Sequence, residues 1–229
     1  MVILRFISKI FLISLIYSDT QKDIRALWIV RDHMVNPKLI DDVVEFAYQN
    51  GFNHIFAQVR GRGDSFYNSS LVPKSNLVDS NFDPLFYLIS NSKNKDIKVH
   101  AWLNIYYLWS SPKKPKQRNH LFFLKPEWLD RKKDDEYILN KEFLIEEKKI
   151  IIDREGFFLA PTNPDVNLHL INVISELTKN YQIDGIHYDY IRYHSEDYGY
   201  NSVGLSIFAE QQDHGNKLFD ENFNRIFLD

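Results

Sequence analysis

The sequence predicts an α/β fold of the TIM (β/α)8-barrel type, with about the first four β/α units present. Apolar runs typical of strands alternate with helix-like segments, and three of those helices open on an Asn-Pro or Asp-Pro pair. Such alternation gives parallel strands joined by helices, either in a barrel or in an open doubly wound sheet. No Gly-x-Gly-x-x-Gly motif follows the first strand and no P-loop occurs, which disfavours a nucleotide-binding sheet and favours the barrel.

The expected elements follow one another in a regular order. Strands are expected over residues 26–30, 52–59, 97–103 and 183–190. The helices between them begin at Asn36-Pro37, Asp83-Pro84 and Asn163-Pro164, because Asn and Asp are good N-caps and proline suits the first helical position. In the first helix apolar residues recur at helical spacing, and Gly51 is expected to end it in the left-handed conformation.

The third and fourth strands are separated by a long connection over residues 105–162, which includes a basic, proline-rich stretch at 111–118. Long excursions after a barrel strand usually build a binding cleft, although a surface loop would look similar. After Asn201 the chain is polar and no further strand is evident. The sequence therefore predicts a partial barrel over residues 23–229 that lacks its C-terminal half. Its open sheet edges would favour self-association.

Composition limits the possible functions. Lys plus Arg number 28 and Asp plus Glu number 31, so the net charge is −3, which argues against a nucleic-acid-binding surface. The absence of cysteine excludes disulfides, thiolate nucleophiles and zinc–thiolate sites. Aromatic residues make up 15% of the chain, which suits either stacking on flat ligands or an aromatic core.

The N-terminus resembles a secretory signal. Arg5 and Lys9 accompany an apolar run over residues 10–17, and Ser18 follows. The run is too short to span a bilayer. We therefore expect a signal peptide over residues 1–18 and an exported protein, periplasmic, cell-surface or secreted, with no stable membrane span. The alternative is an ordinary buried first segment.

Polar and aromatic residues cluster at the ends of the four expected strands. Barrel enzymes place their sites at the carboxyl ends of the strands, and buried polar groups need a reason. The expected substrate-binding residues are Arg31, Gln58, Arg60, Asp64, His100, Trp102, Asn104, Tyr107, Trp109, His187, Tyr188 and Arg192. Of these, the aromatic side chains would stack on sugar rings or line the cleft, and the others would bind hydroxyl groups or orient a carboxylate.

The fourth strand carries the sharpest signal. Side chains alternate along a strand, so His187 and Asp189 point to the same face. A carboxylate at the mouth of a barrel is a natural nucleophile or charge stabiliser for glycosyl transfer, and Arg192 would keep Asp189 ionised. The alternative is an Asp–Arg pair that only caps the strand.

The third strand places His100, Trp102 and Asn104 on one face, where they could bind hydroxyl groups and stack on a sugar. The alternative is a core tryptophan beside a hydrogen-bonded histidine. His100, His187 and Asp189 could also form a metal site, but no compact ligand spacing supports it. We therefore predict neither a metal nor a cofactor.

Five ordered motifs carry a family resemblance: Arg25-Ala-Leu-Trp28, Gln58-Val-Arg-Gly-Arg-Gly-Asp64, Val99-His-Ala-Trp-Leu-Asn104, Pro126-Glu-Trp128 and Asp184-Gly-Ile-His-Tyr-Asp-Tyr-Ile-Arg-Tyr193. Together they resemble the glycosyl hydrolase-like 10 family of bacterial proteins, from about Asp23 to Asn201. The resemblance implies a TIM-type barrel that is commonly exported and acts on glycans. It therefore implies a hydrolase whose partner is a polysaccharide or a peptidoglycan glycan.

The fourth strand is also distantly similar to the Asp-Gly-x-x-x-Asp strand of the α-amylase superfamily. That similarity implies that Asp189 is the nucleophile, although His187 stands where amylases have arginine. In that superfamily the general acid lies on the fifth strand, so the similarity also implies that the general acid lies beyond Asp229. The glutamates present, such as Glu127 and Glu155, sit in the long connection with no strand to aim them. The alternatives are a non-catalytic glycan-binding module, an inactive fragment, and a metal-dependent hydrolase.

Overall fold

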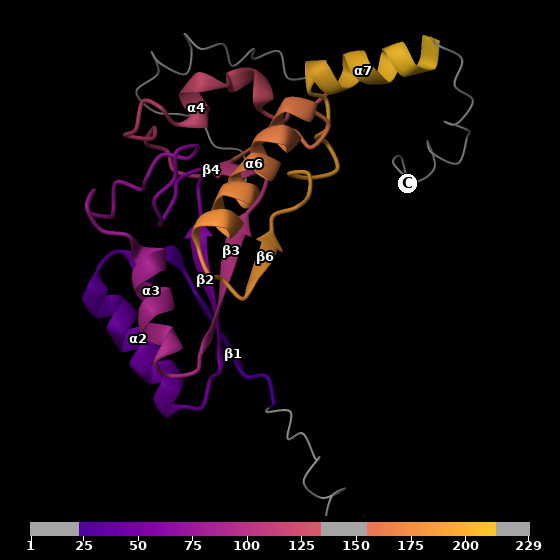
Figure 1. The fold of residues 1–229 in the computed structure, drawn as a ribbon. Helices are drawn as coiled ribbons and strands as arrows, with labels where there is room; N and C mark the ends of the chain where they lie inside the picture. Colours follow the sequence, from indigo (N-terminus) through magenta and orange to yellow (C-terminus); the bar gives the residue numbers. More distant parts are fainter. Residues whose placement is uncertain (1–22, 134–154, 214–229) are drawn as a thin grey trace, which may run out of the picture.

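A four-stranded parallel sheet forms the centre of the computed structural model, which describes residues 23–133 and 155–213 (Figure 1). The strands are β1 (Ala26–Ile29), β2 (His54–Arg60), β3 (Lys98–Asn104) and β6 (Gly185–Asp189). Their order in the sheet, β1-β2-β3-β6, is also their order along the chain. All four expected strands are confirmed, with ends displaced by at most two residues.

Three helices link the strands: α2 (Pro37–Gln49), α3 (Pro84–Lys93) and α6 (Pro164–Asn180). Each begins as the Asn-Pro and Asp-Pro pairs predict. The side chains of Asn36, Asp83 and Asn163 accept hydrogen bonds from the first-turn amides, and a proline occupies the start of each helix. Gly51 follows α2 with a φ of 70°, which confirms the expected left-handed end.

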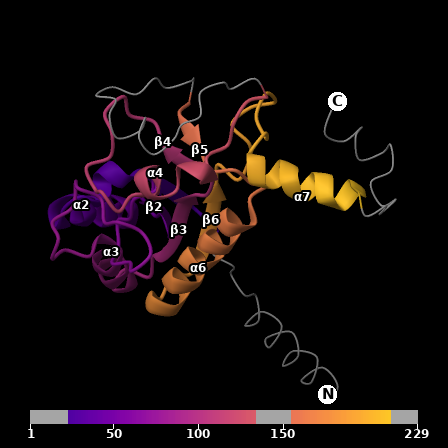
Figure 2. The ribbon, with the colours of Figure 1, turned by 90° about the horizontal axis from the view of Figure 1, so that it is seen from above.

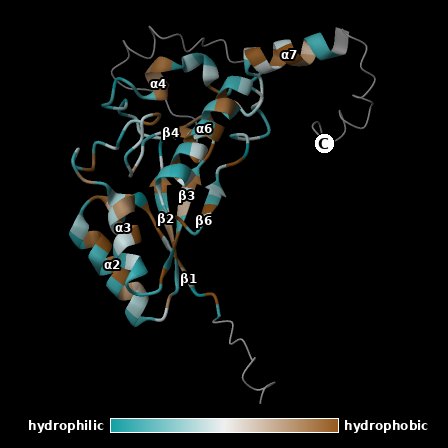
Figure 3. Cartoon of the chain, viewed as in Figure 1, coloured by the Kyte–Doolittle hydropathy of each residue, from teal (hydrophilic) through white to brown (hydrophobic). Residues whose placement is uncertain are grey.

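One hydrophobic core joins the helices to the sheet. Alternate strand residues such as Ile55, Val99 and Ala101 are buried in the same cluster as Val44 of α2 and Val173 of α6. The helices therefore cover one face of the sheet (Figure 1), and each is hydrophobic on part of its circumference only (Figure 3). A doubly wound sheet has helices on both faces, so this arrangement confirms the barrel type.

The long connection contains structure that the sequence did not predict. Strand β4 (Tyr107–Trp109) pairs antiparallel with β5 (Phe157–Phe158), and α4 (Leu121–Leu124) lies between them in sequence. The short 3-10 helix η2 (Pro126–Trp128) follows α4 in this connection. A second 3-10 helix, η1 (Arg31–Met34), lies outside the connection and follows β1. In the described part of the connection, the chain folds over the carboxyl ends of the strands.

Beyond β6, the described part of the chain ends in a helix that the sequence did not predict, α7 (Ser202–Asp213). It extends away from the body of the molecule (Figure 2), and Gly204 packs closely against Thr162 near its start. The expected signal peptide lies outside the described residues. No helix within residues 23–133 and 155–213 has the length and apolar character needed to cross a membrane.

Candidate active site

The face of the sheet opposite the helices carries six of the expected site residues: Gln58, His100, Trp102, Asn104, His187 and Asp189. We call it the inner face, and its members are Trp28, His54, Phe56, Gln58, His100, Trp102, Asn104, His187 and Asp189. Ring contacts and hydrogen bonds join these residues across all four strands. The prediction that His100, Trp102 and Asn104 share one face is confirmed, and so is the prediction that His187 and Asp189 point the same way; the structure adds that both sets lie on the same face of the sheet.

Stacked rings occupy much of the inner face. The Trp28 and Phe56 rings lie 4.6 Å apart, and the Phe56 and His100 rings lie 4.5 Å apart, both nearly parallel. His100 also stacks on His54, and their Nε2 and Nδ1 atoms share a hydrogen bond of 2.7 Å. Burial and the neighbouring His54 lower the pKa of His100. His100 is therefore bound to another imidazole, a partner that the sequence did not reveal.

Asp189 lies at the carboxyl end of β6, where both of its carboxylate oxygens accept hydrogen bonds. The indole Nε1 of Trp102 donates to Oδ2 over 3.1 Å, and the backbone N–H of Tyr190 donates to Oδ1 over 2.8 Å. Its backbone carbonyl accepts from the Ile105 N–H at 2.7 Å, which ties β6 to the end of β3. The carboxylate is thus held in one orientation by two neutral donors.

A chain of hydrogen bonds crosses the carboxyl ends of the other three strands. Arg31 Nη1 donates to Gln58 Oε1 at 3.3 Å, and Gln58 Nε2 donates to Asn104 Oδ1 at 3.5 Å. Asn104 Nδ2 in turn donates to the carbonyl of Gly61 at 3.0 Å. Gln58 and Asn104 are 5% and 2% exposed, so half-buried Arg31 is the member of this chain best placed to reach a ligand.

Three expected contact residues are buried beneath the loops instead. Arg60 is fully buried, and this burial lowers its pKa. Its Nη1 donates to the backbone carbonyls of Asn104 and Ile105. The buried Asp64 accepts from the Arg62 N–H, and Trp109 donates its indole N–H to two backbone carbonyls. These side chains hold the strand ends and loops together, and they are not placed to contact a glycan.

The structure also corrects the expected role of Arg192. Its Nη2 donates to Glu155 over 2.7 Å, and its Nη1 donates to the carbonyls of Tyr193 and His194, whereas Asp189 has other partners. Glu155 lies two residues before Phe157, the first residue of β5, so a short strand in the long connection positions this glutamate, contrary to the expectation. Nothing in the sequence signals this pairing, because the two residues lie in different loops.

The two expected tyrosines occupy different environments. Tyr107 is half-buried at the end of the sheet, and its ring lies 4.6 Å from that of Tyr190. Tyr188 is 47% exposed and alternates away from Asp189, so it belongs to the opposite face of the sheet and not to the inner face. Strand alternation already placed it there, and the cleft-wall role predicted for Tyr188 is not supported.

One titratable side chain near the strand ends escaped the sequence analysis. Asp130 follows η2 and is 7% exposed, and its Oδ1 accepts from the backbone N–H groups of Arg131 and Gly199 at 3.0 Å each. Its Oδ2 is buried and has no hydrogen-bond partner among the described residues. This burial raises the pKa of Asp130 to about 6. The carboxyl links the loop after η2 to the loop after β6.

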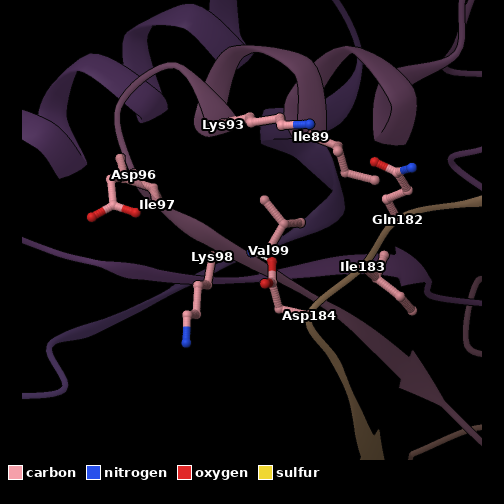
Figure 4. A pocket seen from close by; sticks show the side chains of 9 residues that line it. All are labelled: Ile89, Lys93, Asp96, Ile97, Lys98, Val99, Gln182, Ile183 and Asp184. Carbon is pink, nitrogen blue, oxygen red and sulfur yellow. Dashed lines mark hydrogen bonds between the residues drawn. The ribbon is translucent and has the colours of Figure 1, made fainter.

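A pocket of about 390 Å³ lies at the opposite end of the sheet, near the amino ends of β3 and β6 (Figure 4). It is lined by Ile89, Lys93, Asp96, Ile97, Lys98, Val99, Gln182, Ile183 and Asp184. Asp184 accepts a hydrogen bond from the Val99 N–H at 2.8 Å, which fastens the start of β6 to β3. This end of a barrel contributes to stability and carries no catalytic loops, so the pocket is not the candidate active site.

The alternative metal site also differs from the arrangement that the structure shows. His100 is bound to His54, and Asp189 is bound to Trp102 and Tyr190. Across the described residues, no three His, Asp or Glu side chains are grouped so as to hold a metal ion.

This geometry is that of a partial α/β barrel with a carboxylate fixed at the carboxyl ends of its strands. The sequence profile of the glycosyl hydrolase-like 10 family matches residues 23–222, and the chain belongs to that family. It is 24% identical over 161 residues to glycosyl hydrolase DigH of Escherichia coli strain K12, which covers 68% of this chain and 34% of DigH. The chain therefore spans about a third of the length of this relative.

Two further comparisons agree with this assignment. Glycosyl hydrolase YngK of Bacillus subtilis strain 168 is 23% identical over 160 residues, covering 66% of this chain and 26% of YngK. Among solved structures, α-L-fucosidase isoenzyme 2 from Paenibacillus thiaminolyticus matches 83% of this chain and 26% of its own, with a TM-score of 0.57 and 17% identity. At that identity the structural likeness supports the fold alone.

Proposed function

We propose that this chain carries a catalytic face of a glycoside hydrolase that acts on a polysaccharide or cell-wall glycan, with Asp189 as the nucleophile. The observation that carries the proposal is the fixed Asp189 carboxylate, bound by Trp102 and Tyr190 at the carboxyl end of β6. Names of the relatives DigH and YngK support glycosyl hydrolysis as the reaction class.

In the proposed reaction a carboxylate oxygen of Asp189 forms a bond to the anomeric carbon while the bond to the leaving sugar breaks. Water then hydrolyses the glycosyl-enzyme intermediate. Half-buried Arg31 would bind hydroxyl groups of the sugar, and the half-buried Trp102 indole would form part of the wall beside the reacting ring.

A second carboxyl group must protonate the leaving oxygen. Glu155 lies in the same corner of the molecule as Asp189, and both carboxylates raise the pKa of Tyr190, which is raised first of all by burial. However, the Glu155 carboxylate is already engaged in an ion pair with Arg192 over 2.7 Å. We therefore do not assign Glu155 that role.

The second candidate function is glycan binding without cleavage. One observation favours it: Trp28 is 52% exposed at the edge strand β1 and stacks on Phe56, so the inner face presents aromatic surface of the kind that packs on sugar rings. A binding module would need this surface and no general acid.

The test compares the full chain with its Asp189→Asn and Asp184→Asn variants in a reducing-end assay on peptidoglycan glycan strands and a panel of polysaccharides. Asp184→Asn is the matched control, because Asp184 lies at the other end of β6 and an asparagine oxygen can still accept from Val99 N–H. Release by the wild type and the control, with none by Asp189→Asn, would support the proposal and would show that a general acid lies within this chain. Glycan binding without release by the wild type would support the binding module instead.

A further inference from the structure

Tyr190, the residue after Asp189, has a backbone conformation that tyrosine rarely adopts. Its φ is 50°, in the left-handed region that L-residues other than Asn and Asp usually avoid. The other non-glycine residue with positive φ in the described chain is an aspartate, Asp96. A strained residue of this kind persists only where its surroundings impose the conformation, and such residues cluster at functional sites.

The consequence of this conformation is local and specific. The Tyr190 N–H donates to the Asp189 Oδ1 at 2.8 Å. The Tyr190 carbonyl accepts from the Tyr106 N–H at 3.1 Å, and the Asp189 carbonyl accepts from the Ile105 N–H at 2.7 Å. The backbone carbonyls of Asp189 and Tyr190 are thus bound to the two residues that directly follow β3. The turn directs one N–H donor at the carboxylate, while Trp102 directs a second donor at the other oxygen.

The Tyr190 ring explains how the strain is maintained. It contacts the Tyr107 ring, with centroids 4.6 Å apart, and the Arg192 guanidinium, 5.1 Å from the ring centre. The ring of Phe158 in β5 is a third neighbour, with centroids 5.8 Å apart. Arg192 is itself held by Glu155 and by two backbone carbonyls. Side chains from β4, β5 and the loop after β6 therefore all fix this one ring.

We infer that Tyr190 is a positioning residue: its clamped ring holds the left-handed turn that aims the Asp189 carboxylate, and Trp102 fixes the second carboxylate oxygen. A nucleophile must be aligned within fractions of an ångström of the attacked carbon, so a freely rotating carboxylate reacts more slowly without binding substrate less well. The kinetic consequence rests on the proposed function. The positioning itself is a property of the folded chain and can be measured without substrate.

The kinetic experiment uses Tyr190→Ala, Tyr190→Gly and Tyr190→Phe in the full chain, with Tyr188→Ala as the control on the opposite face. We expect Tyr190→Ala and Tyr190→Gly to lower kcat by about ten- to a hundredfold with KM nearly unchanged. Tyr190→Phe keeps the ring and should restore kcat. Glycine adopts the left-handed conformation freely. Full kcat in Tyr190→Gly would therefore show that the ring plays no part, and would overturn the inference.

The second experiment follows the Trp102 indole N–H by NMR, assigned by its loss in Trp102→Phe. A bond to a carboxylate shifts this resonance, so it should move in Asp189→Asn and move similarly in Tyr190→Ala and Tyr190→Gly. It should stay in place in Tyr188→Ala. A wild-type indole resonance in a folded Tyr190→Ala chain contradicts the inference, whatever the activity. Absence of activity in every chain contradicts the proposed function alone, because the resonance still reports the positioning.

Discussion

Replacing Asp130 by asparagine should stabilise the protein at neutral pH and not at acid pH. Asp130 is 7% exposed, and one of its oxygens accepts two backbone N–H groups while the other has no partner among the described residues. Asparagine keeps the accepting oxygen and has nearly the same shape, but it cannot ionise. The substitution therefore isolates the cost of a buried negative charge from the packing around it.

The magnitude follows from the two pKa values of Asp130. Burial raises its pKa to about 6 in the folded chain, compared with 3.8 for an ordinary aspartate. Each pKa unit corresponds to about 1.4 kcal/mol, which gives about 3 kcal/mol for the whole difference. Between these pKa values the folded chain binds more protons than the unfolded chain, so stability falls as pH rises. The cost of ionisation is absent below pH 3.8 and complete above about pH 6.

The assay is urea unfolding followed by tryptophan fluorescence, at several pH values from 4 to 8. We expect the free energy of unfolding of Asp130→Asn to match that of the wild type near pH 4 and to exceed it by about 3 kcal/mol at pH 7.5. Glu127→Gln is the control, since this nearby carboxylate is exposed and its difference from the wild type should stay below about 1 kcal/mol at every pH. A pH-independent difference for Asp130→Asn would refute the argument.

Two further predictions concern stability near the same strand ends. His120 is the opposite case to Asp130, because burial lowers its pKa to about 4, so the folded chain binds fewer protons between pH 6.5 and 4 and loses stability as pH falls through that range. In the same urea titration, His120→Gln should remove about 3 kcal/mol of the fall in the free energy of unfolding between pH 6.5 and 4. A pH profile unchanged from that of the wild type would contradict this prediction. Gly63 has a φ of 71°, and an added Cβ would lie 2.7 Å from Leu108 Cδ1. We therefore expect Gly63→Ala to lower the free energy of unfolding by about 2 kcal/mol or more, and a wild-type denaturation midpoint would contradict this.

The parts of the fold that the sequence predicted are those fixed by local chemistry. An Asn or Asp side chain caps a helix through its own neighbours, and the apolar runs of the strands need only a period of two. The β4–β5 pair and α7 were missed for the opposite reason. Phe157 and Phe158 pair with residues about fifty positions earlier in the chain, and a strand of two residues carries no periodic pattern of its own.

The candidate site could likewise be predicted only where local strand geometry fixes it. Strand alternation correctly placed Trp102 with Asn104 on one face of β3, and His187 with Asp189 on one face of β6. It could not show which side chains would be covered by loops, so buried Arg60 and Trp109 looked like contact residues. The burial of Asp130 depends on backbone donors from its neighbour and from Gly199, and neither leaves a mark in the sequence around it.

The partner of Asp189 shows most clearly why proximity in sequence misleads. Arg192 lies three residues away, but the chain leaves the strand after Asp189 with a left-handed turn, and the guanidinium is carried to Glu155. Trp102 lies 87 residues away, yet β3 and β6 are in parallel register, with Trp102 beside His187 and Asn104 beside Asp189. A long side chain reaches the diagonal neighbour on the same face, and the indole N–H therefore meets the carboxylate. The identity of a carboxylate's donor is thus set by the register between strands, which the pattern within a single strand does not contain.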